Sequence, residues 1–284
     1  MTDSIPPERL STLLDAAAHI ARTAGARILE VRRGGYDVAH KADASPLTTA
    51  DLAAHAVIAE RLAQLTPELP ILSEESDPET HRRRREWRTY WLVDPLDGTR
   101  AFIRGDGEFS VNIALVHGSE PVLGVVHLPV DGRLWGAARG LGAWREAARR
   151  ERIRTRNAPP VPTVIGSRMH GRPCLERFLE RLGPHREIRM SSIAKACLVA
   201  EGSADLYPRF GPTSEWDTAA AQCIVEEAGG RLTDFRGCAL RYNQRDSLEN
   251  PPFLAFGDPR PAWLEQIAQV SARCLELPPA FPEP

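Results

Sequence analysis

The feature that most constrains the fold is a pair of short apolar runs that each end at acidic residues. Residues 70–72 lead into Glu74 and Glu75, and residues 90–93 stop at Asp94. Short runs of this kind indicate buried strands, and ligand sites of layered α/β proteins lie beyond the carboxyl ends of their strands. The two runs therefore predict carboxylates at strand ends, the place where α/β proteins bind ligands.

Helical and strand-type patterns alternate along the rest of the chain. An apolar stripe over residues 10–28 predicts a helix that ends before Gly34 and Gly35, and a second helix is expected over 49–65, capped by Thr48 or Thr49. Further strands are expected near 109–116, 122–128, 134–143, 164–165, 187–190 and 206–209. Further helices are expected near 174–182, 193–201 and 216–228, and the last of these is stopped by Gly229 and Gly230.

Composition excludes several classes of protein. A formal charge of −2 and a pI near 6.5 argue against a nucleic-acid polymer as partner, because such binders are markedly basic. The five cysteines form no C-x-x-C pair and the eight histidines no H-x-x-x-H pair, which disfavours a disulfide framework and a zinc site. No apolar run reaches the ~20 residues that span a bilayer, and the N-terminus does not resemble a signal peptide. A cytoplasmic protein is expected, with peripheral attachment to the inner membrane left open.

One stretch of high positive charge has two interpretations. Residues 81–88 contain four successive arginines and are predicted to form a solvated surface loop. The alternative is a basic flank that attracts a phosphorylated ligand.

The densest motif is Asp94-Pro95-Leu96-Asp97-Gly98-Thr99. Its two aspartates repel each other unless a hard cation lies between them, and such cations prefer carboxylate oxygens. Gly98 lets the backbone approach a ligand closely, and the N–H groups of Gly98 and Thr99 can donate to phosphate oxygens. On its own, the hexapeptide would be interpreted as a hairpin turn.

Further acids stand at the ends of other predicted elements. Glu74 follows a strand, whereas Asp51 and Asp217 begin helices, where a single acid usually caps the helix. Each of these acids has an ordinary structural explanation. Taken together, they leave many acids at element ends with few bases nearby, which favours a metal site.

The order of these motifs resembles the inositol monophosphatase superfamily. The resemblance rests on Asp51, Glu74-Glu75, the hexapeptide that begins at Asp94, and the run Trp216-Asp217-Thr218-Ala219-Ala220, and it extends from about residue 13 to residue 256. It implies a layered α/β fold, an αβαβα sandwich with the active site between two halves of one catalytic unit. The N-terminal α+β half (1–155) would carry most metal ligands, and the C-terminal α/β half (156–284) would carry Asp217 and the substrate-recognition residues. Charge and proline both rise near this boundary.

Three longer phrases make the chain similar to the bacterial 3'(2'),5'-bisphosphate nucleotidase branch of this superfamily. They lie at residues 91–103, 107–115 and 197–212. The chain also departs from the pattern: Arg100 replaces a usual lysine, Met190 stands where glycine is common, and Ala196 where an aromatic residue is frequent. The last two fall in the half that faces the substrate, so they bear on nucleotide specificity more than on metal chemistry.

The resemblance implies a magnesium-dependent, lithium-sensitive phosphomonoesterase with two or three bound Mg²⁺ ions. Glu74, Asp94 and the carbonyl of Leu96 would hold one ion. Asp94, Asp97 and Asp217 would hold the second, with Asp94 bridging. Two cations about 3.5–4 Å apart can clamp the attacking and leaving oxygens of an in-line displacement, so the assignment is chemically sensible.

The resemblance also implies the catalytic residues. Asp51 and Thr99 would orient the nucleophilic water, and a third, weaker metal would lie between Asp51 and Glu74. No covalent nucleophile is required, because phosphoryl transfer needs mainly positioning and charge neutralisation. Glu75 is either a residue behind the metal ligands or a solvent-facing one.

The substrate is expected to contact the metal-site residues and a second group in the C-terminal half. The full set is Glu74, Leu96, Asp97, Gly98, Thr99, Ser191, Ser192, Lys195, Arg209 and Asp217. A 5'-phosphate needs a cation or amide donors beyond the metals, which Lys195 and Arg209 can supply. Two alternatives stay open: Lys195 as an exposed helix lysine, and His170 as a weak additional contact.

The implied activity is hydrolysis of 3'-phosphoadenosine 5'-phosphate to AMP and phosphate, in sulfur assimilation or nucleotide recycling. An inositol monophosphatase or fructose 1,6-bisphosphatase is the alternative within the superfamily, because one metal site serves all of these substrates. A non-catalytic metal or phosphate binder is the alternative from another class, and Asp51 and Thr99 argue against it. The partner is a small phosphorylated molecule, and the oligomeric state is left open.

Overall fold

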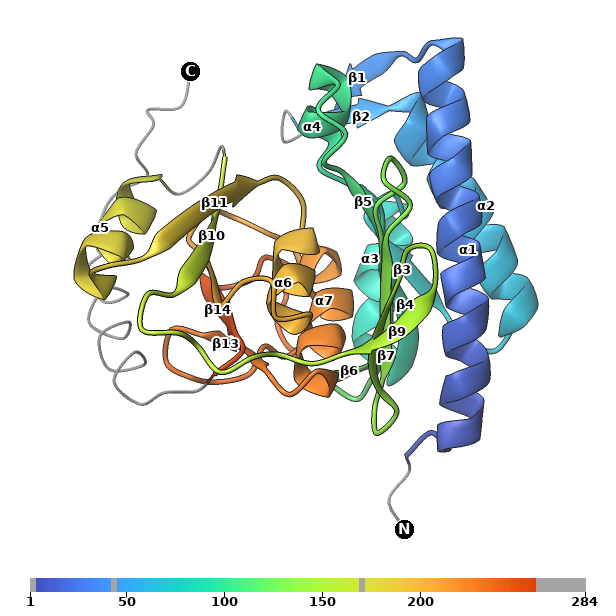
Figure 1. Cartoon of the computed structure of the whole chain (residues 1–284). Coiled ribbons are helices and arrows are strands. Elements are labelled where there is room, and N and C mark those ends of the chain that lie inside the picture. Colours follow the sequence, from blue (N-terminus) through green and yellow to red (C-terminus); the bar gives the residue numbers. More distant parts are fainter. Residues whose placement is uncertain (1–3, 42–44, 169–171, 259–284) are drawn as a thin grey trace.

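The protein is described by a computed structural model that covers residues 4–41, 45–168 and 172–258, and it is built in five layers (Figure 1). From one side to the other these are helix α5 (Arg172–Leu182), a five-stranded sheet, helices α6 (Ala194–Ala200) and α7 (Glu215–Glu227), a seven-stranded sheet, and helices α1 (Pro7–Gly34) and α2 (Thr49–Leu65). The predicted αβαβα sandwich is confirmed.

The larger sheet has the strand order β3-β4-β5-β6-β7-β8-β9. Strands β3 and β4 are parallel, and each later neighbour is antiparallel. The strands are β3 (Ile71–Ser73), β4 (Thr89–Asp97), β5 (Ser110–His117), β6 (Glu120–His127), β7 (Leu134–Ala138), β8 (Gly142–Glu146) and β9 (Arg150–Ile153). Hairpins suffice for this meander, and the expected turn between β5 and β6 is present at residues 118–119.

The smaller sheet has the order β11-β10-β12-β14-β13 and mixes parallel and antiparallel pairs. Its strands are β10 (Thr163–Ser167), β11 (Arg186–Met190), β12 (Leu206–Arg209), β13 (Arg231–Asp234) and β14 (Phe253–Phe256). A separate two-stranded ribbon, β1 (Val38–His40) and β2 (Pro46–Thr48), lies beside the start of α2. Short helices complete the described chain: α3 (Pro78–Arg83), a 3₁₀ turn (Arg84–Glu86) and α4 (Thr99–Arg104).

Three apolar cores hold the layers together. One lies between α1, α2 and the outer face of the larger sheet and contains Trp91 and Ile113. The second lies between the two sheets around α6 and α7 and contains Leu92 and Ala114. The third joins α5 to the outer face of the smaller sheet. Successive residues of a strand point to opposite faces, so Leu92 and Trp91 enter different cores and the acids that follow have a defined side.

Two expectations for local structure are wrong. Residues 81–88 are mostly helical rather than a loop, and Arg84 is buried, where it donates to Asn243 Oδ1 (2.6 Å) and to the backbone carbonyl of Arg245 (2.9 Å). A buried arginine is favourable only when its donors are paired, and here the Asn243 side chain and backbone carbonyls pair them. Strand β4 also does not stop at Asp94, but continues through Pro95 to Asp97.

Within the described residues, none of the helices combines the length and the apolar character that crossing a membrane requires. His170 and the tail beyond residue 277 lie outside the described residues.

Candidate active site

Strand β4 positions the first two acids of the site. Its register against β5 pairs Asp94 with Asn112 and Asp97 with Ser110, and an irregularity lies between the two pairs. The two aspartates are three residues apart, and the irregularity lets both reach the same region. The Asp94 carboxylate accepts the backbone N–H of Leu96 at 3.0 Å, and Asp97 accepts the Ser110 hydroxyl at 3.2 Å.

Gly98 is required where β4 passes into α4. Its φ of +94° is disfavoured for residues with a side chain, and an added Cβ would lie 3.2 Å from the carbonyl oxygen of Glu108. The Asp-Gly-Thr run is therefore not a hairpin turn. It is the junction that ends β4 and begins the helix that contains Thr99.

The third acid comes from α7, on the opposite side of the site. Asp217 is the N3 residue of a capping box, in which its Oδ2 accepts the backbone N–H of Ser214 at 2.9 Å. Oxygens of Asp94, Asp97 and Asp217 nevertheless all lie within 4.8 Å of one another. The helix-capping explanation of Asp217 and its place among the acids are both correct, because capping uses one carboxylate oxygen. We call these three residues the acid cluster.

Asp51 and Thr99 lie next to each other, and Thr99 lines the same cavity as the acid cluster. Asp51 is also the N3 acid of a capping box, and its Oδ2 accepts the N–H of Thr48 at 2.8 Å. Its other oxygen accepts the Thr99 hydroxyl at 3.2 Å, and that hydroxyl lies 3.3 Å from the Leu96 carbonyl. The sequence-predicted water-orienting pair is thus in contact.

Glu74 lines the same cavity as the acid cluster but is ion-paired to a lysine. The Lys41 ammonium lies 2.6 Å from Glu74 and 2.7 Å from Glu75. The Glu75 side chain is only 5% exposed, so the solvent-facing alternative for Glu75 is wrong. Lys41 had no assigned role in the sequence, because its partners lie more than thirty residues away.

Burial and crowding raise the pKa of these acids. Burial raises the pKa of Asp94 well above its ordinary range, and repulsion from Glu74 and Asp97 adds to the effect. The same causes raise the pKa of Asp217 to about 7. Burial also raises the pKa of Asp51 and Glu74, although Lys41 opposes the rise at Glu74. Buried carboxylates that destabilise one another in this way fit a hard divalent cation, which would supply the missing positive charge.

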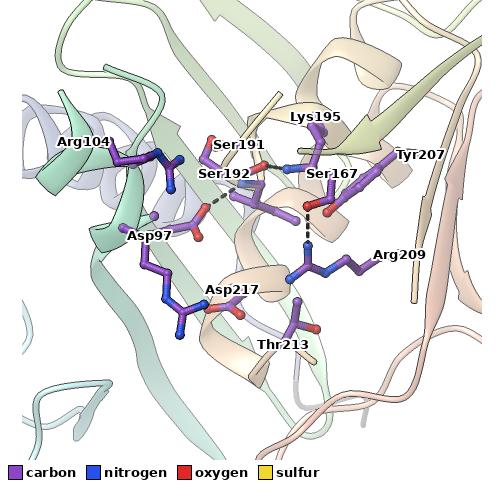
Figure 2. A pocket seen from close by; sticks show the side chains of 14 residues that line it. Asp97, Arg104, Ser167, Ser191, Ser192, Lys195, Tyr207, Arg209, Thr213 and Asp217 are labelled. Atoms are coloured by element: carbon purple, nitrogen blue, oxygen red, sulfur yellow. Dashed lines mark hydrogen bonds between the residues drawn. The ribbon is translucent and has the colours of Figure 1, made fainter. Parts of the chain in front are cut away.

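A second cavity adjoins the acid cluster and carries the opposite charge (Figure 2). Its cations come from α4, α6 and β12, and we call the group Arg100, Arg104, Lys195 and Arg209 the cationic pocket. The cavity at the acid cluster has a volume of about 420 Å³ and the cationic one about 100 Å³. The two form one continuous site, because the same five residues line both: Asp97, Gly98, Arg100, Thr213 and Asp217.

Lys195 is the most enclosed cation of this pocket. It is 2% exposed, donates to the backbone carbonyl of Ser192, and lies 5.1 Å from the centre of the Tyr207 ring. Burial, together with repulsion from Arg209, lowers the pKa of Lys195 to about 7. The alternative of an exposed helix lysine is therefore wrong.

Arg209, Ser191 and Ser192 also line the cationic pocket. Arg209 donates to Ser167 Oγ at 3.2 Å (Figure 2). It also donates to the Pro212 carbonyl at 2.9 Å, and the two bonds fix its guanidinium. The backbone N–H of Ser191 donates to Glu108 at 2.8 Å, and that of Ile193 donates to Asp97 at 2.6 Å. These two bonds tie the smaller-sheet half to the end of β4 and to the segment that precedes β5.

Sequence reasoning missed Arg104, Tyr207 and Lys41 among the residues that surround the site. Arg104 had a usable signal, because residues four apart on a helix share a face and Arg100 precedes it by four. Tyr207 and Lys41 had none, since their places depend on contacts between distant elements.

The layered fold and the acids at the junction of its two sheets define a class of α/β sandwich proteins with a carboxylate site. Residues 9–276 match the model of the inositol monophosphatase family. The 3'(2'),5'-bisphosphate nucleotidase CysQ of Escherichia coli (strain K12) is 48% identical over 243 residues, which cover 85% of this chain and 98% of that protein.

Solved structures agree with this result. CysQ from Bacteroides thetaiotaomicron is 37% identical, with a TM-score of 0.76 over 88% of this chain and 98% of that one. An inositol monophosphatase from Thermotoga maritima is 26% identical, with a TM-score of 0.77 over 93% and 99%. The chain belongs to the inositol monophosphatase family.

Proposed function

We propose that this protein is a magnesium-dependent 3'(2'),5'-bisphosphate nucleotidase, which hydrolyses 3'-phosphoadenosine 5'-phosphate to AMP and phosphate in sulfur assimilation or nucleotide recycling. The observation that carries the proposal is the direct junction of the acid cluster with the cationic pocket. A substrate with two phosphates requires two sites of positive charge, one for the reacting phosphate and one for the other. The name of the 48% identical relative gives the same substrate class, and the 37% identical structure is also a CysQ.

The metal ligands are assigned from the residues that surround the larger cavity. Glu74, Asp94 and the Leu96 carbonyl would hold one Mg²⁺, and Asp94, Asp97 and Asp217 a second. When bound, divalent cations neutralise the phosphate oxygens and lower the pKa of a bound water. Glu74 would exchange Lys41 for the ion as its partner.

Asp51 and Thr99 would prepare the attacking water. The Asp51 carboxylate, held by Thr48 and Thr99, is oriented as a hydrogen-bond acceptor beside the acid cluster. An acceptor fixed in this way can align the lone pair of a water with the phosphorus and take up its proton as attack begins. The N–H groups of Gly98 and Thr99 at the start of α4 would donate to the phosphate oxygens.

The cationic pocket would bind the phosphate that is not hydrolysed. Lys195 and Arg209 come from different elements and are each held by backbone carbonyls, so they are positioned before the substrate arrives. Ser191 and Ser192 line the same cavity and would donate hydroxyls. We also propose that residues 1–155 supply the metal ligands except Asp217, and residues 156–284 the recognition of the nucleotide.

Phosphate release from four substrates tests the proposal. The purified protein is assayed with 3'-phosphoadenosine 5'-phosphate, inositol 1-phosphate, fructose 1,6-bisphosphate and 3'-AMP, in Mg²⁺ with and without millimolar Li⁺. The bisphosphorylated nucleotide should have the highest kcat/KM, and Li⁺ should inhibit its hydrolysis. Preference for inositol 1-phosphate or the sugar bisphosphate would reassign the substrate, and binding without release of phosphate from any of them would indicate a non-catalytic relative.

A further inference from the structure

Asn112 of β5 is a buried amide opposite Asp94 of the acid cluster. Strand β5 runs antiparallel to β4, and its register places Ser110 opposite Asp97 and Asn112 opposite Asp94. Leu92 and Ala114, which are also opposite each other, enter the core between the two sheets. Because side chains alternate along a strand, Asp94 and Asn112 lie on that same face, where paired residues have Cβ atoms about 4.5–5.5 Å apart.

Ser110 shows how the side chains on this face of β5 hold the acids of the cluster. Its side chain is fully buried, and its hydroxyl donates to Asp97 at 3.2 Å. An acid of the cluster is therefore held from behind by the residue opposite to it on β5. Asn112 occupies the equivalent place for Asp94, two residues further along the same strand.

Asn112 differs from Ser110 because its polar atoms have no partner. Its side chain is fully buried, and neither Nδ2 nor Oδ1 has a hydrogen-bond partner among the described residues. A buried amide without partners destabilises the fold, and an apolar residue of the same size would avoid that cost. Packing alone therefore does not explain an asparagine at this position.

We infer that Asn112 is a positioning residue for Asp94, whose side-chain amide donates to the Asp94 carboxylate when a divalent cation is bound. A carboxylate that bridges two cations must keep a fixed orientation, and hydrogen-bond donors behind the ligands provide it. Leu96 N–H already donates to one Asp94 oxygen, so a second donor would hold the carboxylate plane. The inference rests on the proposed metal-binding function of Asp94.

The test compares metal affinity with the stability of the metal-free protein. Magnesium is titrated by calorimetry into wild type, Asn112→Leu, Asn112→Ser and Ile113→Val, and the melting temperature of each is measured in chelator. Asn112→Leu should weaken Mg²⁺ binding about 10–100-fold, the usual effect of losing a partner behind a ligand, while its metal-free melting temperature equals or exceeds that of wild type. Asn112→Ser, which keeps a shorter donor, should recover part of the affinity.

Ile113→Val is the matched control, because Ile113 enters the core on the other face of the same strand. It should lower the melting temperature slightly and leave Mg²⁺ affinity unchanged. If Asn112→Leu binds Mg²⁺ within twofold of wild type, or if Ile113→Val weakens binding as much, the inference is overturned. Wild type that takes up no Mg²⁺ would instead contradict the proposed function.

A measurement on the wild-type protein does not depend on the folding of any variant. The side-chain amide signal of Asn112, assigned by its loss in Asn112→Ser, is followed by ¹⁵N NMR during a magnesium titration. We expect it to shift and saturate with the ion. A signal that does not respond while Mg²⁺ binds would also overturn the inference.

Discussion

The cavities at the acid cluster and at the cationic pocket share Asp97 and Asp217 in their lining, yet the acids and the cations are brought together in different ways. The acid cluster comes from the end of one strand and the start of one helix, and its members occur in short local motifs. The cationic pocket combines two arginines of α4 with one residue each from α6 and β12, and these elements meet only when the two sheets are packed together. A site for a charged substrate can therefore have one half fixed by local sequence and the other by tertiary contact.

The largest effect is expected in the acid cluster. Asp94→Asn should lower kcat about 10³-fold, because the several kcal/mol of charge stabilisation by bound cations depend on this ligand. The variant should also melt at a higher temperature than wild type in chelator, since a buried acid with a strongly raised pKa has been neutralised. Steady-state kinetics and thermal melts check both results, and wild-type kcat in Asp94→Asn would refute the metal assignment.

Asp217→Asn should raise the Mg²⁺ concentration that the reaction requires and leave the fold unchanged. An asparagine at the N3 position can still accept the Ser214 N–H, so α7 should begin at the same residue. The Mg²⁺ concentration for half-maximal rate should rise about 10–100-fold, in the range seen for damaged metal sites. An unchanged Mg²⁺ dependence would leave Asp217 with its capping function alone.

In the cationic pocket, Lys195→Met should raise the KM for the bisphosphorylated nucleotide about tenfold and change kcat little, because a charged hydrogen bond contributes ~1.5–3 kcal/mol. The KM for 3'-AMP, which has only the reacting phosphate, should stay the same. Arg104→Met serves as the comparison, since Arg104 already pairs with Asp106 and should contribute less. Equal losses for both substrates would place Lys195 at the reacting phosphate.

The smallest expected effect is on the pH dependence of stability in the metal-free protein, to which the acid cluster and the cationic pocket contribute in opposite directions. Asp217 has a folded-state pKa of about 7, above its unfolded value of 3.8, so its contribution to stability is full below pH 4 and is lost as pH rises through 7. Lys195 has a folded-state pKa of about 7, below its unfolded value of 10.5, so its contribution is full above pH 10.5 and is lost as pH falls through 7.

The melting temperature in chelator should therefore pass through a minimum near pH 7 and rise by about 3–6 °C per pH unit on either side, because one proton per pH unit is ~1.4 kcal/mol and each kcal/mol shifts Tm by about 2–4 °C. Saturating Mg²⁺ should remove the fall in melting temperature between pH 4 and pH 7 and leave the rise above pH 7. A melting temperature that rises steadily from pH 5 to pH 9 in chelator would contradict the assigned pKa values.

The sequence predicted the elements and the acids at their ends for a physical reason, whereas the layers were expected only through the family resemblance. Strand and helix periodicity locate the elements, and an acid at an element end has its position set by the adjacent backbone. Asp217 shows the limit of that reasoning, because the capping pattern was visible but the approach of α7 to β4 was not. Arg84 shows the opposite error, since four arginines in a row gave no sign that one of them meets Asn243 and two backbone carbonyls in the interior.

The recognition residues were harder to predict. Lys195 could be named only through the resemblance, and its burial depends on Tyr207 and Ser192. Ser192 has a φ of +57°, which is uncommon for a serine and could not be predicted from the sequence. Asn112 had no signal either, because an asparagine within an apolar strand pattern is ordinarily assigned to a bend or a solvent-exposed face.

Helix α7 also limits how the length of this chain can change. At Gly124 of β6 an added Cβ would overlap the carbonyl oxygen of Ala220, so the helix rests directly on the sheet one turn after Asp217. One residue inserted between Asp217 and Ala220 would rotate the carboxylate by about 100° around the helix axis. Insertions or deletions in this turn should abolish the site, whereas the exposed turn at residues 147–149, between β8 and β9, should accept them.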